Sequence, residues 1–200
     1  MRTLITIISI LSLSFMGYLL NSVAAQNTLE KATFAGGCFW CMEPPFEKLN
    51  GVTQVLSGYA GGTGPDPTYQ NYAKKGYVEA VEVTYDPSVI SYNQLLDVFW
   101  RQIDPTDANG QFVDRGAEYR SAIFYRDESQ KELGQKSKEA LAKTGKFHKP
   151  IVTEILKETS FYKAEDYHQD YYKKNPIRYA YYRSRSGRDQ YLTKVWGKDR

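Results

Sequence analysis

The sequence predicts an α+β fold in which helices cover one face of a mainly antiparallel sheet. The 200 residues are enough for one domain with a sizeable core. Between Thr33 and Tyr125, strand-like and helix-like hydrophobic patterns follow one another in the order β-α-β-β-α-β. Two more helical patterns, over 128–143 and 164–174, flank a short strand-like segment. This order is typical of a two-layer split βαβ (ferredoxin-like) plait, here with extra C-terminal helices.

The predicted strands are short segments rich in β-branched or aromatic residues and bounded by turn residues. The strictest alternation runs from Glu79 to Tyr85 and ends at Asp86-Pro87. A loop rich in glycine and proline, 61–67, precedes it. The predicted strands are 32–34, 52–60, 79–85, 121–125 and 152–155.

The most regular helical pattern follows Ser91, which forms a capping-box sequence with Gln94 three residues later. Pro44 and Pro45 are expected in the first turn of the first helix, where a missing N–H costs little. From Tyr179 onward the chain shows no clean periodicity, so no element is predicted there. The predicted helices are 42–49, a short one over 68–75, 91–103, 128–143 and 164–174.

Composition excludes some classes of partner. The formal net charge of +3 is too small and too evenly spread to indicate nucleic-acid binding. Arg183, Arg185 and Arg188 form the one basic cluster, which is expected to be a solvated tail. The seventeen tyrosines, many of them near the C-terminus, indicate a packed segment with some members lining a site.

The N-terminus is predicted to be a secretory signal peptide over residues 1–25. Arg2 supplies a positive start, residues 4–20 are mostly apolar, and Val23-Ala24-Ala25 offers a small-residue cleavage site. The alternative is an uncleaved membrane anchor, since the apolar run approaches the ~20 residues that span a bilayer. Both place the remaining domain, 26–200, outside the cytoplasm, in the periplasm or the extracellular space.

The segment Gly36-Gly37-Cys38 follows a strand and precedes a helix, which places a thiol at a helix N-terminus. Unpaired N–H groups and the helix dipole favour an anion there, so the pKa of Cys38 is predicted to fall. Phe39 and Trp40 would provide an apolar surface beside the sulfur. Cys41 is close enough in the chain to form a disulfide with Cys38.

Two cysteines three residues apart are a chemical pair rather than a structural disulfide framework. A zinc site would need four ligands, and the only histidines are His148 and His168, which lack the short spacing of zinc ligands. We therefore expect no metal. His148 is expected at the surface and His168 in a structural role.

Several motifs together resemble the peptide methionine sulfoxide reductases of the A type. The resemblance runs from about Thr33 to Pro176 and covers these segments: Gly36-Gly37-Cys38-Phe39-Trp40-Cys41-Met42-Glu43, Gly58-Tyr59-Ala60-Gly61-Gly62, Asp66-Pro67-Thr68-Tyr69, Glu79-Ala80-Val81, Tyr85-Asp86-Pro87, Asp114-Arg115-Gly116-Ala117-Glu118-Tyr119-Arg120-Ser121 and Ala164-Glu165-Asp166-Tyr167-His168-Gln169.

The resemblance implies a cysteine, Cys38, that reduces methionine S-sulfoxide. It implies assistance by four further residues, which are Glu79, Tyr69, Tyr119 and Asp114, and a methyl pocket lined by Phe39 and Trp40. The sulfoxide oxygen leaves easily only if it is protonated, so Glu79 would need a raised pKa in a water-poor site. The hydroxyls of the two tyrosines would donate hydrogen bonds to the same oxygen, and Asp114 would orient a water or a tyrosine. Without the resemblance, Glu79 would be a solvent-facing strand residue, both tyrosines would be packing residues, and Asp114 would cap a turn.

The implied cycle leaves Cys38 as a sulfenic acid, which Cys41 resolves to a disulfide that an external, thioredoxin-like dithiol reduces. No metal, flavin or nucleotide cofactor takes part, and a monomer acting on oxidised proteins or peptides is expected. Many members of the family carry glycine at the position of Cys41 and place the resolving cysteine near the C-terminus, so here either Cys41 or an external thiol must resolve. Two other classes stay open: an exported thiol–disulfide oxidoreductase using Cys38 and Cys41, and a non-catalytic module that binds methionine peptides.

Overall fold

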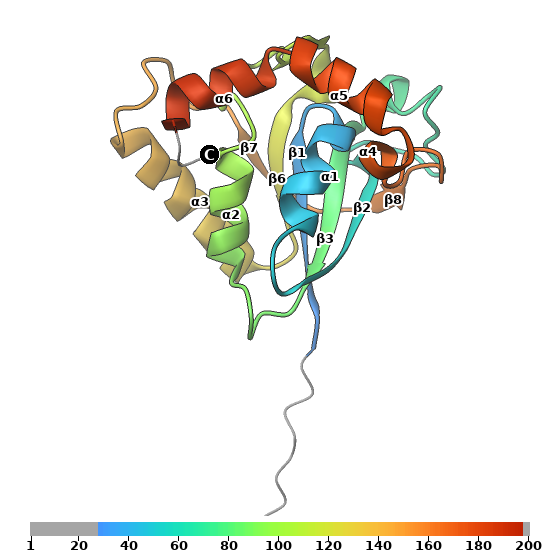
Figure 1. Ribbon diagram of the computed structural model, residues 1–200. Helices are drawn as coiled ribbons and strands as arrows, with labels where there is room; N and C mark the ends of the chain where they lie inside the picture. The colour runs from blue at the N-terminus through green and yellow to red at the C-terminus, as the bar shows by residue number, and fades with distance from the viewer. Residues whose placement is uncertain (1–27, 198–200) are drawn as a thin grey trace, which may run out of the picture.

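The computed structural model describes residues 28–197 and confirms a mixed α+β fold (Figure 1). The predicted signal peptide, 1–25, lies outside these residues. Six strands form one sheet and two short strands form a separate hairpin. The strands are β1 (Glu30–Gly36), β2 (Val52–Ala60), β3 (Val78–Tyr85), β4 (Gly110–Gln111), β5 (Asp114–Arg115), β6 (Ser121–Tyr125), β7 (Glu154–Lys157) and β8 (Phe161–Lys163).

Six α-helices and two short 3₁₀ helices complete the described chain. None of the helices within residues 28–197 combines the length and apolar character needed to cross a membrane. The helices are α1 (Phe39–Glu47), α2 (Tyr92–Trp100), α3 (Glu128–Lys143), α4 (Tyr171–Lys174), α5 (Pro176–Arg185) and α6 (Arg188–Trp196), with 3₁₀ helices at Ala73–Lys75 and Ala117–Tyr119.

The strand order in the sheet is β7-β6-β1-β3-β2-β8, and neighbours are antiparallel except for the parallel pair β6 and β7. The first four predicted strands are confirmed as β1, β2, β3 and β6. The fifth forms as β7, two residues later than predicted, and β8 has no predicted counterpart. Because these two strands extend the sheet on both sides, the α+β class is confirmed while the narrower ferredoxin-like plait stays a prediction.

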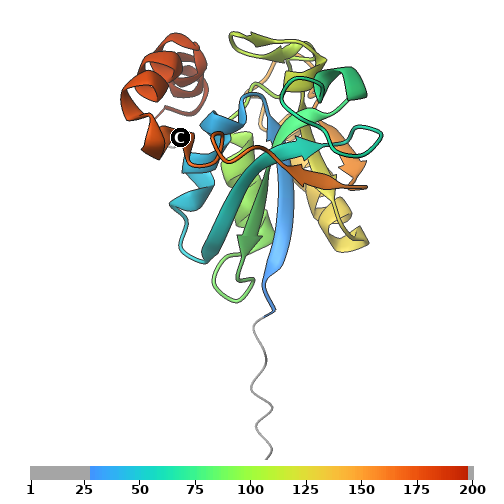
Figure 2. The ribbon, with the colours of Figure 1, turned by 90° about the vertical axis from the view of Figure 1, so that its right-hand side faces the viewer.

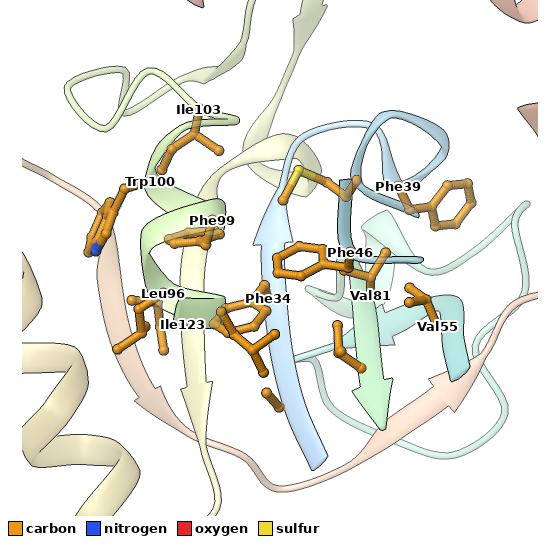
Figure 3. Close-up of a cluster of buried hydrophobic side chains, with 14 of the residues drawn as sticks. Phe34, Phe39, Phe46, Val55, Val81, Leu96, Phe99, Trp100, Ile103 and Ile123 are labelled. Atoms are coloured by element: carbon orange, nitrogen blue, oxygen red, sulfur yellow. The ribbon is translucent and has the colours of Figure 1, made fainter. Parts of the chain in front are cut away.

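The main core lies between the sheet and helices α1, α2 and α3, which contribute to one cluster of buried side chains. Phe34 of β1 is at its centre, with its ring 5.2 Å from the ring of Phe46 in α1 and 5.2 Å from that of Phe99 in α2 (Figure 3). The predicted capping box is present at the start of α2, where Ser91 and Gln94 cap each other. These contacts fix α1 on the sheet and therefore fix the residues at its N-terminus.

Helix α1 begins earlier than predicted, at Phe39 rather than near Met42. Pro44 and Pro45 therefore lie inside the helix and not in its first turn. Because a proline has no backbone N–H, the carbonyls of Trp40 and Cys41 have no partner four residues further along the helix. The carbonyl of Cys41 accepts instead from a side chain of α5, as described below.

The predicted helix over 164–174 is wrong except for its last turn, α4. The side-chain amide of Gln169 hydrogen-bonds both backbone groups of Ser57 in β2. Its Oε1 accepts from the N–H of Ser57 at 2.9 Å, and its Nε2 donates to the carbonyl oxygen of Ser57 at 2.9 Å. Asp170 has a φ of 54°, a left-handed conformation that ends any helix on its N-terminal side. The short helix predicted over 68–75 is also reduced, to the 3₁₀ turn at Ala73–Lys75.

The segment after Tyr179, for which no element was predicted, forms most of α5 and all of α6. Figure 1 shows both helices at the end of the molecule at which α1 begins, and Figure 2 shows that they lie on the side of the sheet that α1 and α2 cover. Helix α5 has no fully buried residue, and Ile177 and Tyr181 are 87% and 64% exposed. The helix consists mainly of tyrosine and arginine and buries no aliphatic residue, so the sequence contains no apolar run that would indicate it.

Candidate active site

Cys38 lies where the first strand turns into the first helix. Strand β1 ends at Gly36 and α1 begins at Phe39, so Cys38 is the residue directly before the helix, as predicted. Gly37 has a φ of 78°, and a Cβ there would lie 2.6 Å from the Cβ of Gln111. Glycine is therefore required at this turn, both for its conformation and for the space it leaves.

The side chain of Glu79 points to this helix N-terminus and not to solvent. Its Oε2 atom accepts a hydrogen bond from the backbone N–H of Phe39 at 3.0 Å, and Oε1 accepts from the hydroxyl of Tyr72 at 3.1 Å. Glu79 is 2% exposed, and burial raises its pKa to about 8. The carboxyl group beside Cys38 is therefore mostly protonated at neutral pH, and it can donate a proton.

The predicted fall in the pKa of Cys38 is wrong for the reduced pair. Burial raises this pKa well above its ordinary value, and the hydrogen bond to Cys41 raises it further. The first amide of α1, which the sequence predicts to favour a Cys38 thiolate, donates to Glu79 instead. The pKa of Cys41 falls to about 6 because Cys38 hydrogen-bonds its sulfur and because Arg188 and Arg183 lie nearby. The pKa of Cys41 thus falls while that of Cys38 rises, and the two cations lie on the Cys41 side of the pair.

Three tyrosines surround the Glu79 carboxyl, and the sequence indicates two of them, Tyr69 and Tyr119. Burial and the charge of Glu79 raise the pKa of both. The third, Tyr72, is hydrogen-bonded to Glu79 and to Tyr119, and its ring stacks on Tyr69 at 5.9 Å. The sequence could have indicated Tyr72 only through its position three residues after Tyr69. It is one of seventeen tyrosines, and no motif includes it.

Asp114 is paired with a residue that the sequence analysis did not single out, Tyr182 of α5. The Tyr182 hydroxyl donates a hydrogen bond to Oδ2 of Asp114 and is also in hydrogen-bond contact with the Cys38 thiol. Burial raises the pKa of Asp114, whereas the hydrogen bond from Tyr182 lowers it. Asp114 therefore positions Tyr182, which contacts Cys38.

The Tyr182→Phe variant is expected to lose about 1 kcal/mol of unfolding free energy, because the half-buried carboxyl of Asp114 loses its hydrogen-bond donor. Denaturant unfolding measures this loss. Tyr181→Phe is the matched control, since Tyr181 is 64% exposed on the same helix and its change should stay within about 0.5 kcal/mol. Equal stability of the two variants would contradict the role given to the Tyr182 hydroxyl.

Aromatic rings form a wall beside the thiol. Trp40 stacks on Tyr171 with ring centroids 3.7 Å apart, and its Nε1 donates to Nδ1 of His168 at 3.2 Å. The His168 ring also lies 4.9 Å from Phe39 and 4.5 Å from Tyr69. Phe39 is only 1% exposed, so its ring is mainly a core residue, while Trp40 is half-buried. The role of Phe39 and Trp40 in a methyl pocket stays a prediction.

The buried face of His168 and the exposed position of His148 agree with their predicted roles. Both cysteines are buried free thiols. Within residues 28–197, no group of three or more His, Cys, Asp or Glu side chains is arranged to hold a metal ion.

Comparison with known proteins decides the family. The family model described as peptide methionine sulfoxide reductase matches residues 30–200. This chain belongs to that family. A peptide methionine sulfoxide reductase MsrA of Halalkalibacterium halodurans is 53% identical over 175 residues, which are 86% of this chain and 99% of the relative. The chain is therefore a reductase of methionine sulfoxide, an oxidoreductase of the MsrA kind.

Solved structures show the same relationship. Mxr1 from Saccharomyces cerevisiae in its reduced form aligns with this reductase at a TM-score of 0.69 and 33% identity, covering 74% of this chain and 87% of Mxr1. The structure of Mxr1 in complex with Trx2 aligns at a TM-score of 0.52 and 27% identity, covering 72% of this chain and 84% of that one.

Proposed function

We propose that this reductase acts on the S epimer of methionine sulfoxide in exported proteins and peptides, and on the free amino acid, and that Cys38 is the thiol that attacks the sulfoxide. One observation carries the proposal: the buried carboxyl of Glu79, with its raised pKa, accepts a hydrogen bond from the residue next to Cys38. A neutral carboxylic acid beside a nucleophilic sulfur is what reduction of a sulfoxide needs.

In the first step, Cys38 attacks the sulfoxide sulfur and Glu79 protonates the oxygen as the S–O bond weakens. The proton of the Cys38 thiol replaces the one that Glu79 gives to the oxygen, so the step needs no net proton from solvent. Tyr69 and Tyr119 flank Glu79 and would donate hydrogen bonds to the same oxygen. The net result is methionine and a Cys38 sulfenic acid, so the substrate sulfur is reduced and Cys38 is oxidised.

In the second step, Cys41 condenses with the sulfenic acid to give a disulfide and water, and an external dithiol then restores both thiols. The position of Cys41, one helical turn after Cys38 and hydrogen-bonded to it, supports this role. The complex of the structural neighbour Mxr1 with Trx2 supports a thioredoxin-like protein as the reductant. We propose that no metal, flavin or nucleotide cofactor takes part.

The export of this reductase, from the predicted signal peptide 1–25, is part of the proposal, as are the single domain over 26–200, its monomeric state and its role in repairing oxidised exported proteins. Sequencing the N-terminus of the protein recovered from its native host tests the cleavage after about Ala25. An intact apolar N-terminus would favour the membrane-anchored alternative.

The epimer assay tests the proposed reaction. The chain is incubated with dithiothreitol and a peptide carrying both sulfoxide epimers, which are separated by chromatography at intervals. We expect the S epimer to disappear while the R epimer remains, because a chiral site of fixed acid and nucleophile fits one configuration at sulfur. Reduction of protein disulfides with neither epimer consumed would instead favour the thiol–disulfide oxidoreductase.

A further inference from the structure

Two arginines of the tail helices, the half-buried Arg183 and the buried Arg188, lie beside Cys41, although the sequence predicts a solvated tail for them. Nη1 of Arg183 donates to the carbonyl oxygen of Cys41 at 3.3 Å, and its Nε and Nη2 contact Oδ1 of Asp189 at 3.1 and 2.8 Å. Arg188 is wholly buried, with Nη1 2.6 Å from the carbonyl oxygen of Gln102 and Nη2 2.9 Å from that of Gly36. Only Arg185, the third member of the cluster, is exposed as predicted.

The proline pair in α1 accounts for the position of Arg183. Pro45 has no N–H to offer the carbonyl of Cys41, which is four residues earlier in the helix. A buried carbonyl without a donor costs free energy, and the Arg183 guanidinium supplies one. The same group also hydrogen-bonds the Cys41 thiol. The Cys41 carbonyl that lacks a helical N–H partner thus holds a cation beside the sulfur of the same residue.

Arg188 brings a second charge that its direct partners do not neutralise. These partners are two backbone carbonyls, the sulfur of Met42 at 3.8 Å and the ring of Phe112 at 4.6 Å. A guanidinium stays charged in proteins, and a buried charge requires an anion nearby. Among the described residues, the ionisable groups that its charge stabilises as anions include Cys41 and Asp114.

The other ionisable groups around Cys41 come from three elements and do not cancel this effect. Cys38 precedes α1 and donates a hydrogen bond to Cys41, and Glu79 of β3 is mostly neutral at neutral pH. Tyr179 and Tyr182 of α5 remain protonated because burial raises the pKa of both. The positive groups that face Cys41 are therefore the two guanidinium groups, of which Arg183 is also paired with Asp189 of α6.

We propose that Arg183 and Arg188 are positioning residues for the second half of the cycle, which hold Cys41 as a thiolate aimed at Cys38. This inference rests on the proposed function, in which Cys41 resolves the sulfenic acid. In the step, the Cys41 thiolate attacks the sulfur of Cys38–SOH, an S–S bond forms, and the S–O bond breaks. The leaving hydroxide takes a proton from solvent and departs as water. Cys41 is thereby oxidised, and the Cys38 sulfur is reduced by the same electron pair.

Titration of single-cysteine variants by the ultraviolet absorbance of the thiolate tests the inference without any sulfoxide. In Cys38→Ser, the remaining Cys41 is expected to ionise below the ordinary pKa of a cysteine, since the serine hydroxyl can still donate to it. In Cys41→Ser, the remaining Cys38 is expected to ionise above that value. Both variants keep all their arginines. A lower pKa for Cys38 than for Cys41 in these variants would overturn the inference.

Adding Arg183→Met to Cys38→Ser should raise the titration midpoint of the Cys41 thiol by about one pH unit, because an adjacent cation is lost. Arg183→Lys in the same background should keep the pKa of Cys41 close to its original low value, since lysine retains the positive charge. Arg185→Met is the matched control: it removes an equal charge from the same helix at an exposed position and should leave the midpoint unchanged. Equal shifts for Arg183→Met and Arg185→Met would show that only the overall charge matters, and would overturn the inference.

The kinetic experiment is a rapid quench of a single turnover in the otherwise native chain. With Arg183→Met, release of methionine should stay within twofold, while disulfide formation near neutral pH should slow about threefold. A one-unit rise in pKa lowers the thiolate fraction about tenfold, and the greater nucleophilicity of a more basic thiolate offsets part of that. The deficit should vanish at alkaline pH, where Cys41 is ionised in both proteins. A deficit that is equal at all pH values would indicate a merely structural role and would overturn the inference.

A chain that releases no methionine in this experiment would disprove the proposed function. The absorbance titration would still decide where the charge of the thiol pair resides, so the two failures are distinguishable.

Discussion

The Glu79→Gln variant is expected to reduce methionine sulfoxide about 10²–10³-fold more slowly than the parent chain, because glutamine cannot protonate the departing oxygen. The structure supports this size of effect, since the Glu79 carboxyl is buried and accepts the N–H of Phe39 at 3.0 Å. Single-turnover release of methionine measures the step directly. Glu43→Gln is a matched control: Glu43 is also buried with a pKa raised by burial to about 7, but its partners are Ser57 and Asp170. That variant should keep its rate within about threefold.

The pH dependence gives Glu79 a second signature. The acid form is the active one, and its pKa of about 8 means that the parent rate should fall as pH rises through about 8. The Glu79→Gln variant should lack this decline. Stability has the same sign, because the folded chain keeps a proton on Glu79 that the unfolded chain releases above about pH 4.5. The parent therefore loses stability between about pH 4.5 and 8, and near pH 7 the variant should melt no lower than the parent.

The Cys41→Ser variant is expected to release one methionine per chain at close to the parent rate and then stop recycling. With a thioredoxin-like donor, steady-state turnover should fall about 10²-fold, because resolution by Cys41 is intramolecular and resolution by a protein thiol is not. Mass spectrometry after one turnover should find the oxidised form of Cys38 and no disulfide. Unchanged multiple turnover with the same donor would remove Cys41 from the proposed cycle.

Those parts of the fold with a strong local signal could be predicted from the sequence. Ser91 and Gln94 mark the start of α2 because each caps the backbone of the other, and the alternation from Glu79 to Tyr85 marks β3. The orientation of the Glu79 side chain could not be predicted from that alternation. A polar residue near the end of a strand is solvent-facing by default, and only the resemblance indicated a buried acid.

The tail and the segment before it could not be predicted, because tertiary contacts determine them. The side-chain amide of Gln169 pairs with the backbone of β2 as a neighbouring strand would, so the helical pattern over 164–174 does not correspond to a helix. Tyr182 and Arg188 contact the site from mostly polar helices, for which the sequence offers no apolar run. The pKa order of the thiols depends on the same distant residues, together with a hydrogen bond that Glu79 takes from the start of α1.

The arrangement around Cys41 has a consequence for how the protein is made. Cys41 and the guanidinium that touches its carbonyl are 142 positions apart in the chain. A ribosome produces one long before the other, and until α5 and α6 have emerged and docked, the nascent thiols lack the cations that set their acidity. The acidity of the two thiols is therefore set only when α5 and α6 have docked on the rest of the domain.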